Sequence, residues 1–411
     1  MNCKKIFFLI FVIIFCFSSY CFAEVPDVQC PSAILIHADT GKVLYEKESH
    51  KVMYPASTTK IMTAILVLEN AQLTDIATVS SNAVKSIPEG YSHASLQIGE
   101  QFTVEQLLHV LLIPSANDAA NVLAEHVAGS VAEFANMMNQ TAIEIGCKNT
   151  HFVNPSGIHS NDHYSTAYDL ALIGQYAMKN NIFRSIVRKT SCSLPATKQY
   201  GLDDRVFTTT NALLKPNSNL EINNYYYPYA IGIKTGFTTP AGNCLVAQSS
   251  NNGLDFIVTV LGGAQDANGI SQRYSDIIQL FNYAYENYTI EKIQNANSVL
   301  KTIEIKGGTS ETKNLNLLIK DDISVFISKQ NIENPILPQI TLKENLVAPI
   351  AQGEVVGHVQ YIVEDIVYQS DLLAETAVEK ENILPIFLKI FFIVLLLFFV
   401  CLLIFRTKKV D

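Results

Sequence analysis

Apolar residues recur with a helical period in the stretch that follows Pro55. They are spaced three or four positions apart and comprise Ile61, Met62, Ile65, Leu66 and Leu68. This spacing places them on one face of an α-helix. We therefore predict a buried helix from about Ser57 to about Asn70, beginning just after the proline.

A second helical region is predicted over residues 99–128. The segment Thr103-Val104-Glu105-Gln106 is a helix-start pattern. An apolar face follows at Leu107, Leu108, Leu111 and Leu112. The segment Pro114-Ser115-Ala116-Asn117 interrupts the region. Such a break either caps a helix or displays polar side chains at the mouth of a cleft.

Runs rich in β-branched and aromatic residues predict strands on both sides of the helices. Residues 32–37 and 42–46 flank Asp39-Thr40-Gly41, which predicts a hairpin. Three further runs, 230–237, 241–247 and 256–261, follow one another with short links. Strands joined by short links form an antiparallel sheet.

Residues 290–381 have a different pattern. Short β-like runs at 303–305, 323–327 and 355–361 alternate with Gly, Asn and Asp turns. This alternation predicts a small β-domain after the first domain. No cluster of residues in it is typical of a catalytic site.

The chain begins with a pattern typical of secretion. Lys4 and Lys5 precede the apolar run 6–17, and Cys21-Phe22-Ala23 follows it. We predict a signal peptide over residues 1–23. A retained membrane anchor is the alternative, but the apolar core is short and small residues follow it.

The chain ends with a longer apolar run. Residues 386–405 are apolar except for Lys389, and Arg406, Lys408 and Lys409 follow at once. This length is sufficient to cross a bilayer, and the trailing cations place residues 406–411 in the cytoplasm. Lys389 can extend to the interface. The expected location is the cell membrane, with a single span and the main domain outside the cytoplasm.

Charge and cysteine content narrow the possible functions. The formal net charge is −9 and becomes more negative once the signal is removed, so nothing indicates nucleic-acid binding. The cysteine spacing resembles no zinc motif, and we predict neither a metal nor a cofactor. Whether disulfides form is left open for the four cysteines outside the two terminal runs: Cys30, Cys147, Cys192 and Cys244.

Ser57 and Lys60 are the first candidate catalytic pair. On the predicted helix they lie one turn apart on one face, near the positive helix N-terminus. That position suits a nucleophilic serine beside a lysine that must lose its proton. The same spacing recurs at Ser298/Lys301 and Ser310/Lys313, but in a polar region without a helix-start pattern. An ordinary helix cap is the alternative for Ser57.

Two further motifs follow in the chain. Ser115 and Asn117 form a Ser-x-Asn sequence, which also occurs by chance elsewhere. Lys234-Thr235-Gly236 occurs once and ends an apolar run. Its glycine lets the backbone approach a ligand, while Lys and Thr can hold a carboxylate.

The three motifs together resemble the penicillin-recognising serine acyl transferases. Their order and separations match that superfamily. The stretch from about Ala33 to about Asn287 is similar to a low-molecular-mass penicillin-binding protein, a serine-type D-alanyl-D-alanine carboxypeptidase. Ala116 departs from the pattern, where the family commonly has Gly. The resemblance is also carried by residues 57–64, 111–120, 152–157 and 164–169.

The resemblance implies a fold and a domain organisation. The fold is an α/β sandwich in which helices flank an antiparallel sheet and an inserted helical subdomain carries Ser115. The implied parts are a catalytic domain over 24–288, a β-rich stalk over 290–381 and a transmembrane helix over 386–405.

The resemblance also implies roles. Ser57 attacks the bond between the last two D-alanines of a peptidoglycan stem peptide, and Lys60 takes its proton. Ser115 relays a proton to the departing D-alanine, and Asn117 orients Lys60 and the substrate. The implied substrate-binding residues are Lys234, Thr235, Gly236, Phe237 and Arg273, of which Phe237 contributes an oxyanion-hole N–H together with Ser57. β-Lactams are the implied inhibitors, and the oligomeric state is left open.

Three alternatives remain at this point. On the same fold, the protein could cut peptidoglycan cross-links as an endopeptidase or act as a β-lactamase. The Glu-x-x-Leu-Asn element that holds water in class A β-lactamases is absent after the second motif. A non-catalytic wall-binding protein is the third alternative, but all the expected side chains are present.

Overall fold

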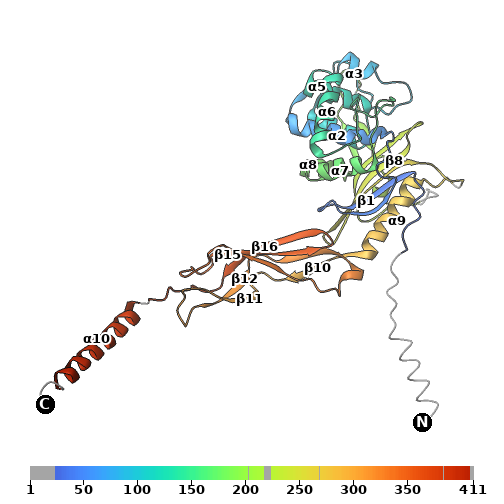
Figure 1. The fold of residues 1–411 in the computed structure, drawn as a ribbon. Coiled ribbons are helices and arrows are strands. Elements are labelled where there is room, and N and C mark those ends of the chain that lie inside the picture. Colours follow the sequence, from blue (N-terminus) through green and yellow to red (C-terminus); the bar gives the residue numbers. More distant parts are fainter. Residues whose placement is uncertain (1–23, 202, 217–223, 268, 383, 408–411) are drawn as a thin grey trace, which may run out of the picture. The chain divides into compact units, whose positions relative to one another are not determined.

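The computed structural model describes residues 24–201, 203–216, 224–267, 269–382 and 384–407 of the 411-residue chain. The chain divides into two compact units, one up to Asn287 and one from Tyr288 onward. Figure 1 shows the elements of both units. The predicted signal peptide, residues 1–23, lies outside the described residues.

A five-stranded antiparallel sheet forms the centre of the first unit. Its order is β2-β1-β9-β8-β7. The strands are β1 (Ser32–His37), β2 (Val43–Lys47), β7 (Ala230–Thr238), β8 (Gly242–Asn251) and β9 (Leu254–Gly263). Both the predicted hairpin and the predicted antiparallel pairing of the later runs are confirmed. Strand β7 pairs with β8 alone, so it is an edge strand of the sheet.

Helices cover both faces of this sheet. Phe256 of β9 packs against Tyr285 of α9 (Gln272–Asn287). The next residue, Ile257, lies beside Gly174 of α7 (Ala167–Met178). Neighbouring residues of a strand point to opposite faces, so α9 and α7 lie on opposite sides of the sheet. The predicted α/β sandwich is thereby confirmed.

The remaining helices of this unit form a lobe around α2. The 3-10 turn η1 (Ala56–Thr59) leads directly into α2. The helices are α2 (Lys60–Asn70), α3 (Ser81–Lys85), α4 (Val104–Leu112), α5 (Asn117–Ala128), α6 (Val131–Ile145) and α8 (Asn181–Val187). The predicted helix over 57–70 is therefore correct except for its first turn.

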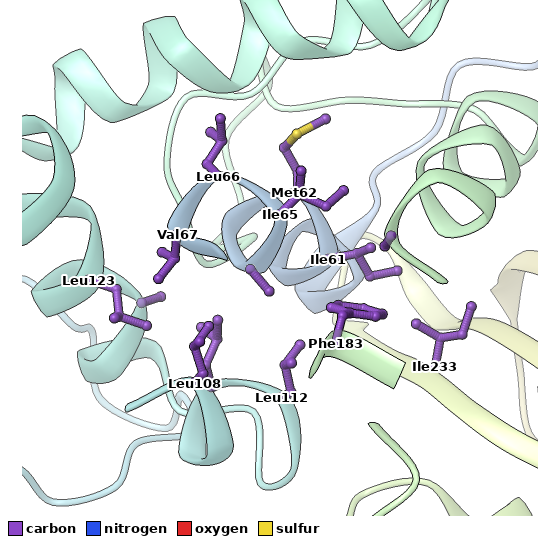
Figure 2. Close-up of a cluster of buried hydrophobic side chains, with 14 of the residues drawn as sticks. Ile61, Met62, Ile65, Leu66, Val67, Leu108, Leu112, Leu123, Phe183 and Ile233 are labelled. Atoms are coloured by element: carbon purple, nitrogen blue, oxygen red, sulfur yellow. The ribbon is translucent and has the colours of Figure 1, made fainter. Parts of the chain in front are cut away.

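The core is built around α2, which is buried over eight consecutive residues, Lys60 to Val67. Figure 2 shows Ile61, Met62 and Leu66 pointing away from the helix axis in different directions, with Leu108 and Phe183 among their neighbours. Each large apolar side chain buried in this way contributes about 1.5–3 kcal/mol. A helix enclosed on all sides positions the residues at its start rigidly.

Short elements complete the first unit. The predicted helix start at Thr103 is confirmed as a reciprocal cap with Gln106. Residues 101–103 are nevertheless extended, because they form β4 and pair with β3. The short elements are β3 (Ile76–Thr78), β4 (Gln101–Thr103), β5 (Ser191–Leu194), β6 (Arg205–Thr208) and η2 (Ala212–Leu214).

The second unit contains a small all-β domain, as predicted. Its five-stranded sheet has the order β11-β12-β16-β15-β14, and β10 (Tyr288–Gln294) pairs with β13 (Ile323–Ser328). The remaining elements are β11 (Val299–Glu304), β12 (Asn314–Ile319), η3 (Lys329–Asn331), β14 (Gln339–Leu342), β15 (Val355–Val363) and β16 (Ile366–Ala374). Leu315, Leu317 and Val359 belong to its own hydrophobic core.

The C-terminal helix α10 covers Leu384–Thr407. Among the residues that the structure describes, no helix meets the length and apolarity needed to cross a membrane. The transmembrane helix predicted at 386–405 is therefore not found there. Part of that run falls on residues whose side chains are not described.

The cysteines outside the terminal runs carry free thiols in the described part of the chain. Cys30, Cys147 and Cys244 are buried, and Cys192 is half-buried. No disulfide therefore contributes to the described structure of the first unit.

Candidate active site

The η1 turn presents Ser57 at a cleft. Ala56 has a φ of 49°, in the left-handed region that a residue with a side chain rarely adopts. The hydroxyls of Thr58 and Thr59 donate back to the carbonyls of Pro55 and Ala56, at 2.7 and 2.8 Å. These bonds hold the turn closed and leave Ser57 as its one half-buried residue.

Lys60 is fully buried beneath Ser57. Its Nζ lies 2.9 Å from Ser57 Oγ, 2.6 Å from Asn117 Oδ1 and 2.6 Å from the Ser156 carbonyl oxygen. The last two atoms can only accept. A neutral amine has two N–H groups, so it satisfies both acceptors and keeps its lone pair for the Ser57 hydroxyl proton. The surroundings of Lys60 thus fit a general base.

Burial and charge favour that neutral form. Desolvation is the main cause that lowers the pKa of Lys60 well below its usual value, and the positive charge of Lys234 lowers it further. Asp118 acts in the opposite direction. Because desolvation dominates, the site favours the neutral amine that a general base requires.

Ser115 and Asn117 lie at the break between α4 and α5. Ser115 has a φ of 70°, and its buried hydroxyl has no hydrogen-bond partner in the described part of the chain. Asn117 begins α5 and accepts from Lys60. The interruption predicted at Pro114 therefore turns Ser115 toward the cleft, where its free hydroxyl can serve a substrate atom.

Lys234 and Thr235 belong to the edge strand β7. The Nζ of Lys234 is buried and donates to the Thr235 carbonyl at 3.0 Å. Burial, with a smaller contribution from the charge of Arg273, lowers the pKa of Lys234 to about 7. The Thr235 hydroxyl hydrogen-bonds with that of Thr210. Two cations and two hydroxyls are thus available for an anionic group.

Gly236 brings β7 against the nucleophile turn. A Cβ at this position would lie 2.9 Å from the Pro55 carbonyl oxygen and 3.0 Å from the Ser57 backbone nitrogen. Only glycine permits this approach, which sets the backbone of β7 beside the Ser57 N–H. The next residue, Phe237, has a side chain that is 60% exposed.

Arg273 comes from the start of α9, far along the chain. Its Nη1 donates to the Gly236 carbonyl at 3.2 Å, and its guanidinium lies 4.8 Å from the Tyr274 ring centre. The arginine is therefore held at the same end of the cleft as Thr235.

A cavity of about 450 Å³ joins these residues. Two lysines, Lys60 and Lys234, lie buried behind it. The lining residues are Ser57, Glu89, Gly90, Tyr91, Ser92, Ser115, Asn117, Thr210, Thr235, Gly236, Phe237, Thr238, Thr239 and Arg273. All nine candidate residues from the sequence thus line this cleft or contact residues that do. Within the described residues no group of His, Cys, Asp and Glu side chains could hold a metal ion.

The sequence motifs assign no role to the loop at residues 152–157, which also belongs to the site. Ser156 contributes its carbonyl oxygen to Lys60, and Thr63, one turn further on α2, donates to the Pro155 carbonyl. Asn154 organises the loop, because its Oδ1 accepts from Ser156 and Gly157. In the sequence, this loop can be identified only from the family resemblance, to which residues 152–157 contribute.

His163 supports the nucleophile turn from behind. Its Nδ1 accepts from the Val153 N–H at 3.1 Å, so Nε2 carries the proton and donates to Thr59 Oγ1 at 2.8 Å. Thr59 in turn donates to Ala56. Burial, with smaller effects from nearby histidines and Lys60, lowers the pKa of His163 to about 3, so the ring stays neutral. This chain of bonds fixes the strained backbone before Ser57.

Comparisons with known proteins agree with this geometry. A family model described as D-alanyl-D-alanine carboxypeptidase matches residues 20–265. A second model, described as penicillin-binding protein 5, C-terminal domain, matches residues 288–380.

Relatives extend over most of the chain. D-alanyl-D-alanine carboxypeptidase DacF of Bacillus subtilis is 32% identical over 80% of this chain and 80% of its own. The structure of penicillin-binding protein 5 from Haemophilus influenzae covers 87% of this chain and 100% of its own, at 26% identity and a TM-score of 0.64. A Streptomyces K15 DD-transpeptidase covers 64% of this chain and 99% of its own, at 32% identity and a TM-score of 0.57. The site and these matches lead to one conclusion: the chain belongs to the D-alanyl-D-alanine carboxypeptidase family.

Proposed function

We propose that this protein is a serine-type D-Ala-D-Ala carboxypeptidase that removes the terminal D-alanine from peptidoglycan pentapeptide stems. The observation that carries the proposal is the buried Lys60 amine, hydrogen-bonded to Ser57 at 2.9 Å with two pure acceptors on its other sides. Membership of the family supports the same substrate class.

Acylation begins when Ser57 Oγ gives its proton to Lys60 and attacks the carbonyl between the two D-alanines. The N–H groups of Ser57 and Phe237 stabilise the negative oxygen that forms, an effect of about 3–4 kcal/mol per donor. The C–N bond then breaks, and the leaving nitrogen receives the proton from Lys60 through Ser115. The products of this step are free D-alanine and an ester on Ser57.

Deacylation uses the same groups in reverse. Water enters where D-alanine left and gives a proton to Lys60 as its oxygen attacks the ester carbonyl. When the ester bond breaks, Ser57 Oγ recovers that proton. The shortened stem leaves as a carboxylic acid that ionises by giving its proton to solvent, and the enzyme returns to its starting protonation state.

The terminal carboxylate is held at the other end of the cleft. Lys234 and Arg273 supply positive charge there, and Thr235 supplies a hydroxyl. A carboxylate bound between them places the last peptide bond beside Ser57. This arrangement favours cleavage at the free C-terminus of a peptide.

Mass spectrometry of two reactions tests the proposal. The protein is incubated with a pentapeptide stem and with a cross-linked stem dimer, and the products are identified. Release of D-alanine from the pentapeptide, absent in Ser57→Ala, is the expected result. Cleavage of the dimer alone would instead make the protein an endopeptidase.

Penicillin provides a second test of the nucleophile. The opened drug stays tethered over the site, which obstructs water, so a long-lived adduct of one drug mass is expected on the Ser57 peptide. An adduct at Ser298 or Ser310 would contradict the assignment. Rapid release of hydrolysed drug would favour a β-lactamase.

We also propose that the enzyme acts outside the cytoplasm, attached to the membrane by its C-terminal apolar segment. Phe391, Leu396 and Phe398 are among the large apolar side chains of α10 that are exposed. Contiguous exposed apolar surface of this kind is typical of contact with lipid or protein. Recovery of the full chain in the membrane fraction would support the proposal.

A further inference from the structure

The cleft has an acidic side chain that the proposed reaction does not use. Among the described residues that line it, Glu89 carries the negative charge and Arg273 the positive one. Arg273 belongs to the carboxylate end of the site. Glu89 comes from the helical lobe, on the segment between α3 and β4, and its side chain is exposed.

Glu89 occupies the corner of a tight turn. The Tyr91 N–H donates to the Pro88 carbonyl at 3.4 Å, and Gly90 has a φ of 85°. A glycine with positive φ at the third position is typical of a type II turn, in which Glu89 is the second residue. Side chains at that corner project away from the turn, and Glu89 is among the residues that line the cavity.

Both ends of this turn are tied to the helix that carries Asn117. The Asn117 N–H donates to the Ser92 carbonyl at 3.0 Å. One helical turn further on, Asn121 Nδ2 donates to Ser86 Oγ, also at 3.0 Å. Two anchors on one helix fix the tip of the turn relative to Asn117, so Glu89 has a defined place beside the reacting groups.

A second set of bonds holds the chain just beyond the turn. The buried carboxylate of Asp118, next to Asn117, accepts from the N–H groups of Ala94 and Leu96 at 2.9 and 3.0 Å. Arg205 donates to the Ser95 carbonyl at 3.0 Å and forms a buried ion pair with Glu100 at 2.8 Å. The segment that carries Glu89 is therefore part of a rigid wall.

The direction of a bound peptide follows from the proposed function, on which this inference rests. The terminal carboxylate lies at Thr235 and the scissile carbonyl at the N–H of Phe237. Residues before the scissile bond then continue past Phe237 toward Thr239, along the stretch of cavity wall on β7 and just beyond it. On the helical side the cavity is lined by residues 89–92.

We propose that Glu89 is a specificity-determining residue for a free ammonium group on the substrate. The group belongs to the side chain of the residue directly before the two D-alanines, where peptidoglycan stems have a diamino acid. A carboxylate facing that position attracts an uncrosslinked amine and gains nothing from an acylated one. The enzyme thereby prefers stems that have not yet been cross-linked through this amine.

Two tripeptides that differ at one amine test the proposal. Nα-acetyl-L-Lys-D-Ala-D-Ala keeps the charged side chain, and the Nα,Nε-diacetyl form has lost it. D-alanine release gives kcat/KM for each peptide with the full-length protein and with Glu89→Gln. Exposed charge pairs contribute little binding free energy, and salt screens them. Wild type should therefore prefer the charged peptide by about fivefold at low salt and by less at high salt.

The variants separate recognition from structure. Glu89→Gln should abolish the preference for the charged peptide, and Glu89→Lys should reverse it. Glu105→Gln removes the same charge from an exposed site on α4 and should keep the wild-type preference. Equal loss for both peptides in Glu89→Gln, or no preference in wild type, would overturn the inference. Failure of wild type to release D-alanine from either peptide would instead overturn the proposed function.

Discussion

At the scale of single residues, the chemistry of the site depends on which groups hydrogen-bond to the Lys60 amine. Lys60 has two neighbours that only accept, Asn117 Oδ1 and the Ser156 carbonyl, and one that can also donate, Ser57 Oγ. A charged ammonium would donate to all three. Once the amine loses one proton, Ser57 is the one of these three neighbours that can donate to its lone pair. Burial and hydrogen bonding therefore both favour a neutral Lys60 that accepts from Ser57.

Replacing Lys60 with arginine tests this description directly. Guanidinium stays protonated at every usable pH, so Lys60→Arg keeps the charge but removes the base. We expect acylation by penicillin to fall by at least about 100-fold, within the range for loss of a general base. The acylation rate is measured by stopping the reaction at set times and quantifying the penicillin adduct. Near-normal acylation in Lys60→Arg would place the base elsewhere.

The pH dependence of kcat/KM should have two limbs. Activity rises with pH as Lys60 becomes neutral, because the base must accept a proton. It falls as pH rises through about 7, because Lys234, whose pKa is lowered to that value, then loses the charge that we propose binds the substrate carboxylate. In Lys234→Arg the alkaline limb should move to much higher pH, since guanidinium stays charged. An unmoved alkaline limb would exclude Lys234 as its cause.

At the scale of elements, the critical contact is between β7 and the η1 turn. The sequence indicated a strand ending in a glycine and a helix beginning at Ser57. It could not indicate that the turn is 3-10, with Ala56 in a left-handed conformation, because that strain is imposed by tertiary bonds. The chain from His163 through Thr59 to Ala56 supplies them.

Gly236→Ala tests this contact. The added methyl would overlap the Pro55 carbonyl and the Ser57 nitrogen, so β7 must move away from the nucleophile turn. Because the Phe237 N–H that we propose for the oxyanion hole shifts with β7, we expect kcat to fall by about 100-fold.

The second unit offers a matched control for the glycine-to-alanine substitution. Gly308 is equally crowded, because a Cβ added there would lie 2.9 Å from Val378 Cγ1 and 3.0 Å from the Lys313 Cα. Gly308→Ala should lower the stability of its own unit and leave kcat unchanged. Full activity in Gly236→Ala, with circular dichroism like wild type, would show that the contact is not required.

At the scale of the whole molecule, the site is assembled from segments far apart in the chain. Periodicity predicted the helices and strands, and the order of three short motifs predicted that they meet. The remaining parts carry no such signal: Ser156 acts through a backbone carbonyl, which every residue has, and Thr210 and Glu89 reach the cleft only through loop geometry. Residue type alone could not identify them.

Catalysis and membrane attachment are assigned to different parts of the chain. Every residue placed in the cleft belongs to the first unit, and the second unit has a hydrophobic core of its own. A chain that ends at Glu381 lacks α10 and should be recovered in the soluble fraction. Its kcat/KM for a pentapeptide should stay within about twofold of the full chain in detergent, because no group that binds or reacts has been removed. A truncated protein that is folded but without turnover would mean that the C-terminal segment takes part in catalysis.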